Sequence, residues 1–143
     1  MIFAFLVQPA LAMDGEMQVC DAYSRMARTM GCDENNYLVA FGDRYCREFV
    51  RVNDRFTPYG QEVLSNIRRC LVKTLSSQKN LTCENVKTRA ERNHVSCYKV
   101  HRFCTLDMPD RLRILGVLWT EIFDPGFNGV MFEILDECGV VST

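Results

Sequence analysis

The chain has 143 residues, of which 48% are hydrophobic and 24% are charged, a composition too apolar for a disordered protein. Its length fits one domain, and a net charge of -1 argues against a dedicated nucleic-acid binder. Eight cysteines are too many for an ordinary reduced enzyme of this size, and their even number favours disulfides.

The first twelve residues form an uncharged apolar run that ends in Ala10-Leu11-Ala12, the small-residue pattern of a signal-peptidase site. The run is too short to cross a bilayer, which takes about 20 apolar residues. We expect residues 1–12 to be a signal peptide, with a start that looks truncated because it lacks a positive charge. The mature domain is then residues 13–143. A buried N-terminal helix is the alternative.

Hydrophobic periodicity predicts helices along the mature chain. The first is expected from about Glu16 to Met30, where Gly31 suits a C-terminal cap. The second is expected from an N-cap at Asp33 to about Phe56. Its apolar residues recur at three- and four-residue steps: Leu38, Phe41, Tyr45 and Phe49.

Thr57 and Pro58 stop the second helix and start a third, as an N-cap residue and a first-turn proline. The apolar stripe of this third helix consists of Val63, Leu64, Ile67, Cys70, Leu71 and Leu75. After a polar connection, the fourth helix is expected from just after Thr82 to about Cys104.

The last two helices are separated by a break at Asp124-Pro125. The fifth follows Pro109, and the sixth ends near Gly139. Alternating patterns are scarce, so no strand is predicted. The expected fold is therefore an all-α, disulfide-stapled bundle of five or six helices without an internal domain boundary.

His94, Cys97, His101 and Cys104 share one face of the expected fourth helix. They are the residue types of a zinc site, but the first and last lie about 15 Å apart along a straight helix, too far for one ion. Cys97 and Cys104 lie about 10.5 Å apart, whereas a disulfide needs Cα atoms within about 7 Å, so each bonds elsewhere. Of the 105 pairings of eight cysteines, spacing alone does not select one.

The segment His94-Val95-Ser96-Cys97-Tyr98 is similar to the His-x-x-Cys-Tyr part of a secreted phospholipase A2 helix. In that family an Asp after the His helps to hold calcium, but here Val95 takes its place. A glycine-rich calcium loop is also missing. We expect no catalytic residues, no metal site and no cofactor, with a degenerate lipase as a lesser alternative.

Charge is distributed unevenly along the chain. Residues 65–104 contain nine Lys or Arg and two Glu, a net of +7, so the rest of the chain carries -8. An acidic partner, for example a sulfated glycan or an acidic receptor face, is one interpretation, and basic faces that are simply exposed to water are the other. The candidate binding residues are Arg68, Arg69, Lys73, Lys87, Arg89, Arg92, Lys99 and Arg102. Asn80-Leu81-Thr82 is a glycosylation sequon, which makes Asn80 a candidate glycan acceptor.

The order of cysteines and aromatic residues resembles the stanniocalcins, which are secreted, disulfide-rich glycoprotein hormones. The resemblance covers about residues 18–138. The residues that carry it are Gln18-Val19-Cys20, Cys32, Cys46-x-x-Phe49, Phe56, Gly60, Leu64, Cys70, Cys83, Cys97-Tyr98, Cys104 and Cys138. By position in the family pattern, the resemblance implies the disulfides Cys20–Cys46, Cys32–Cys83, Cys70–Cys97 and Cys104–Cys138.

The resemblance also implies an extracellular signalling protein that influences calcium and phosphate balance by binding a receptor or another secreted protein. The chain lacks one N-terminal cysteine pair of the family, and it ends at Thr143, before the cysteine that links two subunits. A homodimer is one expected assembly, but not one that is linked through that cysteine. A secreted helical module that binds a glycan, a lipid or a host protein is the alternative. We expect neither a nucleic-acid partner nor a membrane span.

Overall fold

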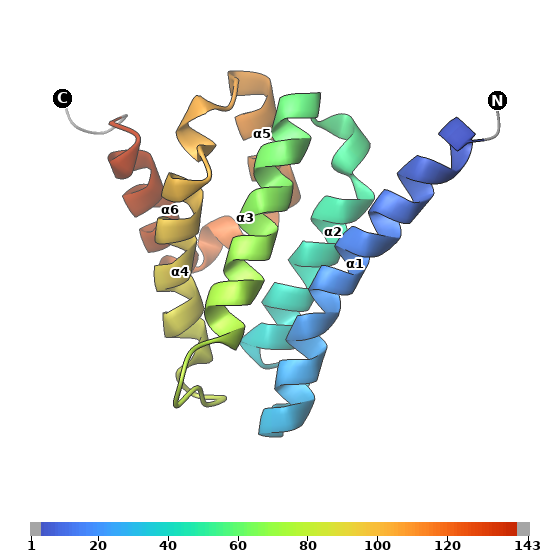
Figure 1. Cartoon of the computed structure of the whole chain (residues 1–143). Coiled ribbons are helices and arrows are strands. Elements are labelled where there is room, and N and C mark those ends of the chain that lie inside the picture. Colours follow the sequence, from blue (N-terminus) through green and yellow to red (C-terminus); the bar gives the residue numbers. More distant parts are fainter. Residues whose placement is uncertain (1–3, 140–143) are drawn as a thin grey trace.

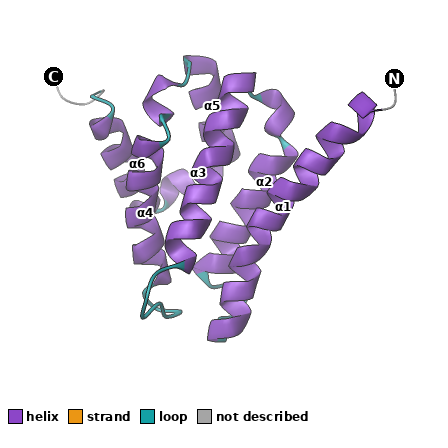
Figure 2. Cartoon of the chain, viewed as in Figure 1, coloured by secondary structure: helices purple, strands orange, loops and turns teal. Residues whose placement is uncertain are grey.

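The computed structural model describes residues 4–139, with side chains from residue 13 onward, and this range is all-α (Figures 1 and 2). The six α-helices are α1 (Ala4–Met30), α2 (Arg44–Arg51), α3 (Pro58–Ser76), α4 (Val86–Val100), α5 (Met108–Val117) and α6 (Pro125–Glu137). A π-helix and three 3-10 helices join them: η1 (Leu38–Asp43), η2 (Asn53–Arg55), η3 (Phe103–Thr105) and η4 (Trp119–Phe123). The described chain is therefore the expected helical bundle.

Helix α3 lies in the middle of the bundle (Figure 1), with α1 packed on one side and α4 on the other. Helix α6 packs on α4, and η1 and α2 pack on α1. The two large groups of buried apolar side chains follow this division. One joins α1, η1, α2 and the facing ends of α3 and α4, and the other lies among α2, α3, α4, α5 and α6.

Four disulfides join elements that are neighbours in space. They are Cys20–Cys46 between α1 and α2, Cys32–Cys83 between the segments after α1 and before α4, Cys70–Cys97 between α3 and α4, and Cys104–Cys138 between η3 and the end of α6. These are the four pairs that the resemblance implies. Every cysteine of the chain is used.

The helix ends were predicted best where a cap residue is present. Gly31, with φ of +73°, ends α1 in a Schellman motif, in which its N–H bonds the Arg28 carbonyl and the Cys32 N–H bonds the Ala27 carbonyl. At the start of α3, the Thr57 hydroxyl accepts a hydrogen bond from the Gly60 N–H at 3.0 Å. Asp124 caps α6 in the same way, and Pro125 occupies its first turn.

Two predicted boundaries near the N-terminus are wrong. Helix α1 begins at Ala4 instead of Glu16, because residues 4–12 continue the same helix. The entry to the second helical segment is marked by Asn36, whose side-chain oxygen accepts from the Leu38 N–H, whereas Asp33 only stabilises a turn by accepting from Asn35. Of the expected signal peptide, residues 1–3 lie outside the described residues, and its cleavage stays a prediction.

The predicted fourth and fifth helices are also too long. Helix α4 ends at Val100 because Arg102 takes a left-handed conformation with φ of +67°, so Cys104 lies on η3 and not on α4. Helix α5 ends at Val117, and the chain continues as η4. Within the residues that the structure describes, no helix is both long enough and apolar enough to cross a membrane.

Candidate functional site

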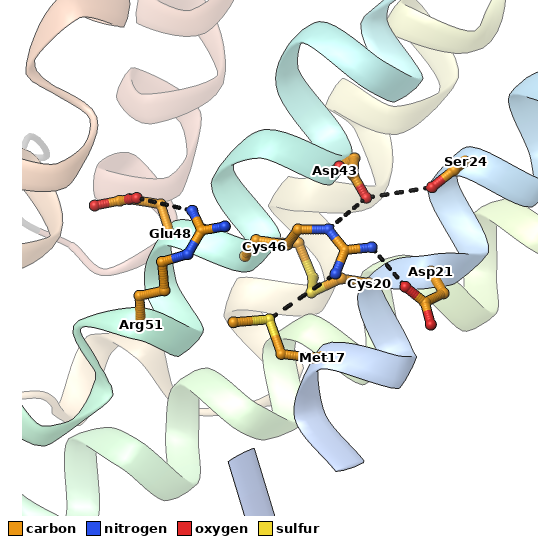
Figure 3. Close-up of polar contacts among 9 residues, drawn as sticks. Met17, Cys20, Asp21, Ser24, Asp43, Cys46, Glu48 and Arg51 are labelled. Atoms are coloured by element: carbon orange, nitrogen blue, oxygen red, sulfur yellow. Dashed lines mark hydrogen bonds and ion pairs between the residues drawn. A yellow bond between two sulfur atoms is a disulfide. The ribbon is translucent and has the colours of Figure 1, made fainter. Parts of the chain in front are cut away.

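A polar cluster beside the Cys20–Cys46 disulfide ties α1 to η1 and α2 (Figure 3). The Arg47 guanidinium donates to Asp21 of α1 at 2.5 Å and to Asp43 at 3.0 Å. These hydrogen bonds hold the pKa of Asp21 below its ordinary value. The charged groups of Asp21, Asp43 and Arg47 bind one another, so the cluster orients α1 against α2 and does not offer a free binding group.

A second polar cluster joins the start of α3 to α5. Asp110 is fully buried, and its carboxylate accepts from the Thr57 hydroxyl at 2.5 Å, the Thr57 N–H at 3.2 Å and Arg113 at 2.7 Å. Burial raises the pKa of Asp110, but hydrogen bonds from Thr57 and Arg113 outweigh burial and hold it below its ordinary value. Because the Thr57 and Arg113 donors all bind the carboxylate of Asp110, this carboxylate is a structural link between the start of α3 and α5.

The bundle encloses a cavity of about 430 Å³, with walls from α1, η1, α2, α3, α4, the segment before α6, and α6 itself. A volume of this size is within the range of small-molecule sites. Its apolar wall includes Phe41, Phe49, Leu64, Ile67, Leu71, Phe127, Val130, Met131 and Ile134. Exposed lining residues, among them Asn35, Arg44 and Lys87, place its opening between η1 and the first turn of α4.

Three tyrosine hydroxyls on the cavity wall have no hydrogen-bond partner within the described chain: those of Tyr23, Tyr37 and Tyr98. Tyr23 is 5% exposed and Tyr98 is 6% exposed. Burial raises the pKa of Tyr98 to about 12 and raises the pKa values of Tyr23 and Tyr37 as well, so all three hydroxyls stay protonated at neutral pH. The three hydroxyl oxygens are not fully enclosed by protein atoms, so either water in the cavity or an occupant that can hydrogen-bond is able to serve them.

Tyr45 shows the contrasting arrangement on the same wall. Its hydroxyl donates to the Glu121 carboxylate at 2.6 Å and contacts the Thr120 hydroxyl at 3.1 Å. The carboxylate of Glu121 is thereby held by a tyrosine of α2. The polar group of Tyr45 is satisfied without an occupant, unlike those of Tyr23 and Tyr98.

One guanidinium group, that of Arg68, is buried in the cavity wall. Glu16 of α1 accepts from Arg68 at 3.0 Å, from Arg69 at 2.5 Å and from the Ser65 hydroxyl at 2.7 Å. Burial lowers the pKa of Arg68, and Glu16 offsets only part of this effect. One carboxylate thus serves two guanidinium groups, which leaves an excess positive charge at this part of the wall.

His94 of α4 also lines the cavity, and its Nδ1 donates to the Ala90 carbonyl at 2.7 Å. Burial lowers the pKa of His94, which favours the neutral ring. The zinc alternative loses two of its four ligands because Cys97 and Cys104 are disulfide-bonded. Among the described side chains, no three His, Cys, Asp or Glu residues are grouped so that they could hold a metal ion.

Comparison of the chain with protein-family models, curated proteins and solved structures finds no match. The site is therefore interpreted from its own geometry.

The eight basic candidates for an acidic partner do not form one free surface. Arg68 is 6% exposed, so its assignment to an exposed binding surface is wrong; its charge is directed to Glu16 instead. Arg69 shares Glu16, Lys87 pairs with Asp124 at 3.1 Å, and Lys99 pairs with Glu137 at 2.7 Å. Arg89 donates to the Lys79 carbonyl. Lys73, Arg92 and Arg102 are exposed, and binding of an acidic partner through them stays a prediction.

Asn80 lies in the exposed segment between α3 and α4, with φ of +60°. Its carbonyl accepts from the Asn85 side chain at 3.0 Å. The side-chain amide of Asn80 is on the surface, where a glycosylating enzyme can reach it. Glycosylation at this position stays a prediction.

No sequence pattern marks the cavity directly. Its lining residues come from positions 23 to 134 and are spread over most of the elements. Tyr23 and Tyr98 fall on apolar helix faces, where an aromatic residue is ordinarily part of the core. Only the assembled bundle shows that their hydroxyls reach the same space without a protein partner.

Proposed function

We propose that this chain is a secreted, stanniocalcin-like signalling protein that acts by binding a receptor or another extracellular protein. The observation that carries the proposal is the disulfide pairing, which is the pairing that the stanniocalcin resemblance implies for all eight cysteines. A helical body held by four disulfides keeps a fixed surface under oxidising conditions outside the cell. By the same resemblance, its signal changes calcium and phosphate transport.

The recognition surface in this proposal is the exposed apolar face of the segment from α5 to α6. Of the nine large apolar side chains that are exposed within the described residues, six belong to this segment: Met108, Leu112, Leu115, Trp119, Phe123 and Phe132. Trp119 is 63% exposed and Phe123 is 79% exposed. Aromatic residues such as these are enriched among the residues that dominate binding energy at protein interfaces.

The proposal includes the absence of catalysis. His94 is the residue that the phospholipase A2 likeness would make a general base. Its Nδ1 is committed to the Ala90 carbonyl, and Val95 stands where a calcium-holding carboxylate would be needed. A binding role therefore explains the arrangement with fewer missing groups than a hydrolytic role does.

The proposal is tested by adding the oxidised, purified protein to cultured epithelial cells and measuring the uptake of radiolabelled calcium and phosphate. The expected result is a saturable change in uptake that is lost when the protein is reduced and alkylated. The double variant W119S/F123S should weaken the effect at least tenfold. The matched control V100S alters an apolar residue that is 67% exposed outside the proposed surface, and it should behave as the wild type.

Uptake that stays unchanged at all protein concentrations would contradict the signalling role. Equal responses to wild type and W119S/F123S would contradict the assignment of the surface. Calcium-dependent release of fatty acid from phospholipid vesicles by the purified protein would contradict the absence of catalysis.

A further inference from the structure

We propose that the cavity of the bundle is a binding site for a small monocarboxylate amphiphile, with its carboxylate at Arg68 and Tyr23 and its apolar chain along the wall. The proposal goes beyond the signalling role and does not depend on it. It rests on the unpaired polar groups of the cavity, on the place of the buried charge and on the apolar character of the remaining lining.

The polar end of the ligand is indicated by donors that lack acceptors. The Nη1 of Arg68 makes no hydrogen bond within the described chain, because Glu16 binds only Nε and Nη2. The hydroxyl of Tyr23 has no acceptor either. Tyr23, Arg68 and Tyr98 all line this one cavity. A carboxylate offers two acceptor oxygens, which suits a guanidinium and a phenol.

The charge of the ligand is indicated by the balance around Glu16. Arg68 and Arg69 both bind this one carboxylate, and burial destabilises the charged form of Arg68 more than Glu16 stabilises it. Of these two guanidinium groups only that of Arg68 lines the cavity, because the Arg69 side chain is 56% exposed, and a ligand carboxylate would add a second negative charge beside Arg68. A neutral ligand would leave the excess in place.

The rest of the ligand is indicated by the wall. Away from Arg68, the buried part of the lining consists of aromatic and aliphatic side chains, including Phe41, Ile67 and Phe127. Near the opening, Lys87 pairs with Asp124 and Tyr45 binds Glu121. Arg44 lies over the Tyr45 ring and has no carboxylate partner within the described chain. The interior therefore favours an uncharged, apolar chain attached to one carboxylate.

Binding is tested with sodium decanoate, kept below its micelle concentration, by isothermal titration calorimetry of the oxidised protein. The expected result is saturable binding of one decanoate per chain, with 1-decanol binding at least tenfold more weakly because it lacks the charge. The double variant Y23F/Y98F removes the two unpaired hydroxyls without changing the shape of the wall. It should unfold at the wild-type urea concentration or above, and it should bind decanoate about tenfold or more weakly.

The matched control is Y59F, because Tyr59 is exposed, bonds Thr105 and does not line the cavity. Y59F should bind decanoate as the wild type does. The variant R68Q removes the charge, and where it folds it should abolish the preference for decanoate over 1-decanol. If R68Q does not fold, the proposal is still tested by the comparison of decanoate with 1-decanol and by the comparison of Y23F/Y98F with Y59F.

The proposal is overturned by any of three results. The first is that decanoate fails to bind saturably, which would mean that the cavity holds only water. The second is that decanoate and 1-decanol bind equally, which would remove the role of the charge. The third is that Y23F/Y98F binds decanoate as tightly as the wild type and Y59F do, which would place the ligand elsewhere on the protein.

Discussion

Replacing Gly42 with alanine tests the closest packing between α1 and η1. A Cβ atom at Gly42 would lie 2.6 Å and 2.7 Å from two carbons of the Tyr23 ring. Carbon atoms in contact prefer about 3.5–4.0 Å, so the ring would have to move by about 1 Å. Tyr23 is 5% exposed, which limits this movement. Overpacking of this kind costs about 1–3 kcal/mol.

The loss of a glycine from a helical segment acts in the opposite direction, by about 1 kcal/mol. The expected net effect of G42A is therefore a loss of up to about 2 kcal/mol in the free energy of unfolding. The matched control is G129A in the interior of α6, where an added Cβ meets no atom within 4 Å. This control should gain up to about 1 kcal/mol from helix propensity alone.

Urea denaturation of both oxidised variants, followed by circular dichroism, provides the measurement. The same chemical change should shift the midpoint down for G42A and up for G129A. If G42A is stabilised as G129A is, then Tyr23 does not pack against η1 as the structure shows.

Three further predictions concern stability. C104A/C138A should lose about 4 kcal/mol in urea denaturation, since the disulfide closes a loop with a sequence separation of 34, and a loss below about 1 kcal/mol would contradict its role. The pKa of Asp110 is lower in the folded protein than in the unfolded chain, where it is about 3.9. The stabilisation of the fold by ionised Asp110 is therefore fully present above the unfolded pKa and is lost as pH falls through the folded pKa. D110N should therefore flatten the acid side of the stability profile and lose the bonds from Thr57, and an unchanged acid limb would refute this. R102G should raise the free energy of unfolding by about 0.5–1 kcal/mol because Arg102 has φ of +67°, whereas a lower free energy of unfolding would show that its backbone is unstrained.

The parts of the fold that local chemistry determines were predictable from the sequence. Gly31, Thr57 and Pro125 each act within one turn of a helix end, so their effect does not depend on distant residues. The all-α class followed from the apolar spacing along each segment. The structure also contains the four disulfide pairs that the proposed resemblance implies.

The boundaries that tertiary packing sets were not predictable. Leu38, Phe41, Tyr45 and Phe49 gave a simple helical stripe, but the structure divides this segment into the π-helix η1 and α2, with Gly42 pressed against Tyr23. Neither glycine nor proline marks the end of α4 near Arg102, so a longer helix was expected there. Helix α1 continues upstream through an alanine-containing apolar run that the sequence had assigned to a leader.

The candidate site shows the same limit. The sequence shows the basic residues between positions 65 and 104. It does not show that Arg68 is buried against Glu16, which lies 52 residues away in the sequence. The cavity depends on how α1, α2, α3, α4 and α6 meet with η1, and the periodicity of the sequence contains no such information. Residue types on helix faces predicted a core, while the unpaired hydroxyls within it became visible only in three dimensions.

The most direct measurement is disulfide mapping of the unreduced protein by proteolysis and mass spectrometry. We expect four cross-linked peptide pairs, joining Cys20 to Cys46, Cys32 to Cys83, Cys70 to Cys97 and Cys104 to Cys138, and no peptide that reacts with a thiol reagent. Any free thiol, or any other partner for one of these cysteines, would contradict both the helical frame and the signalling role built on it.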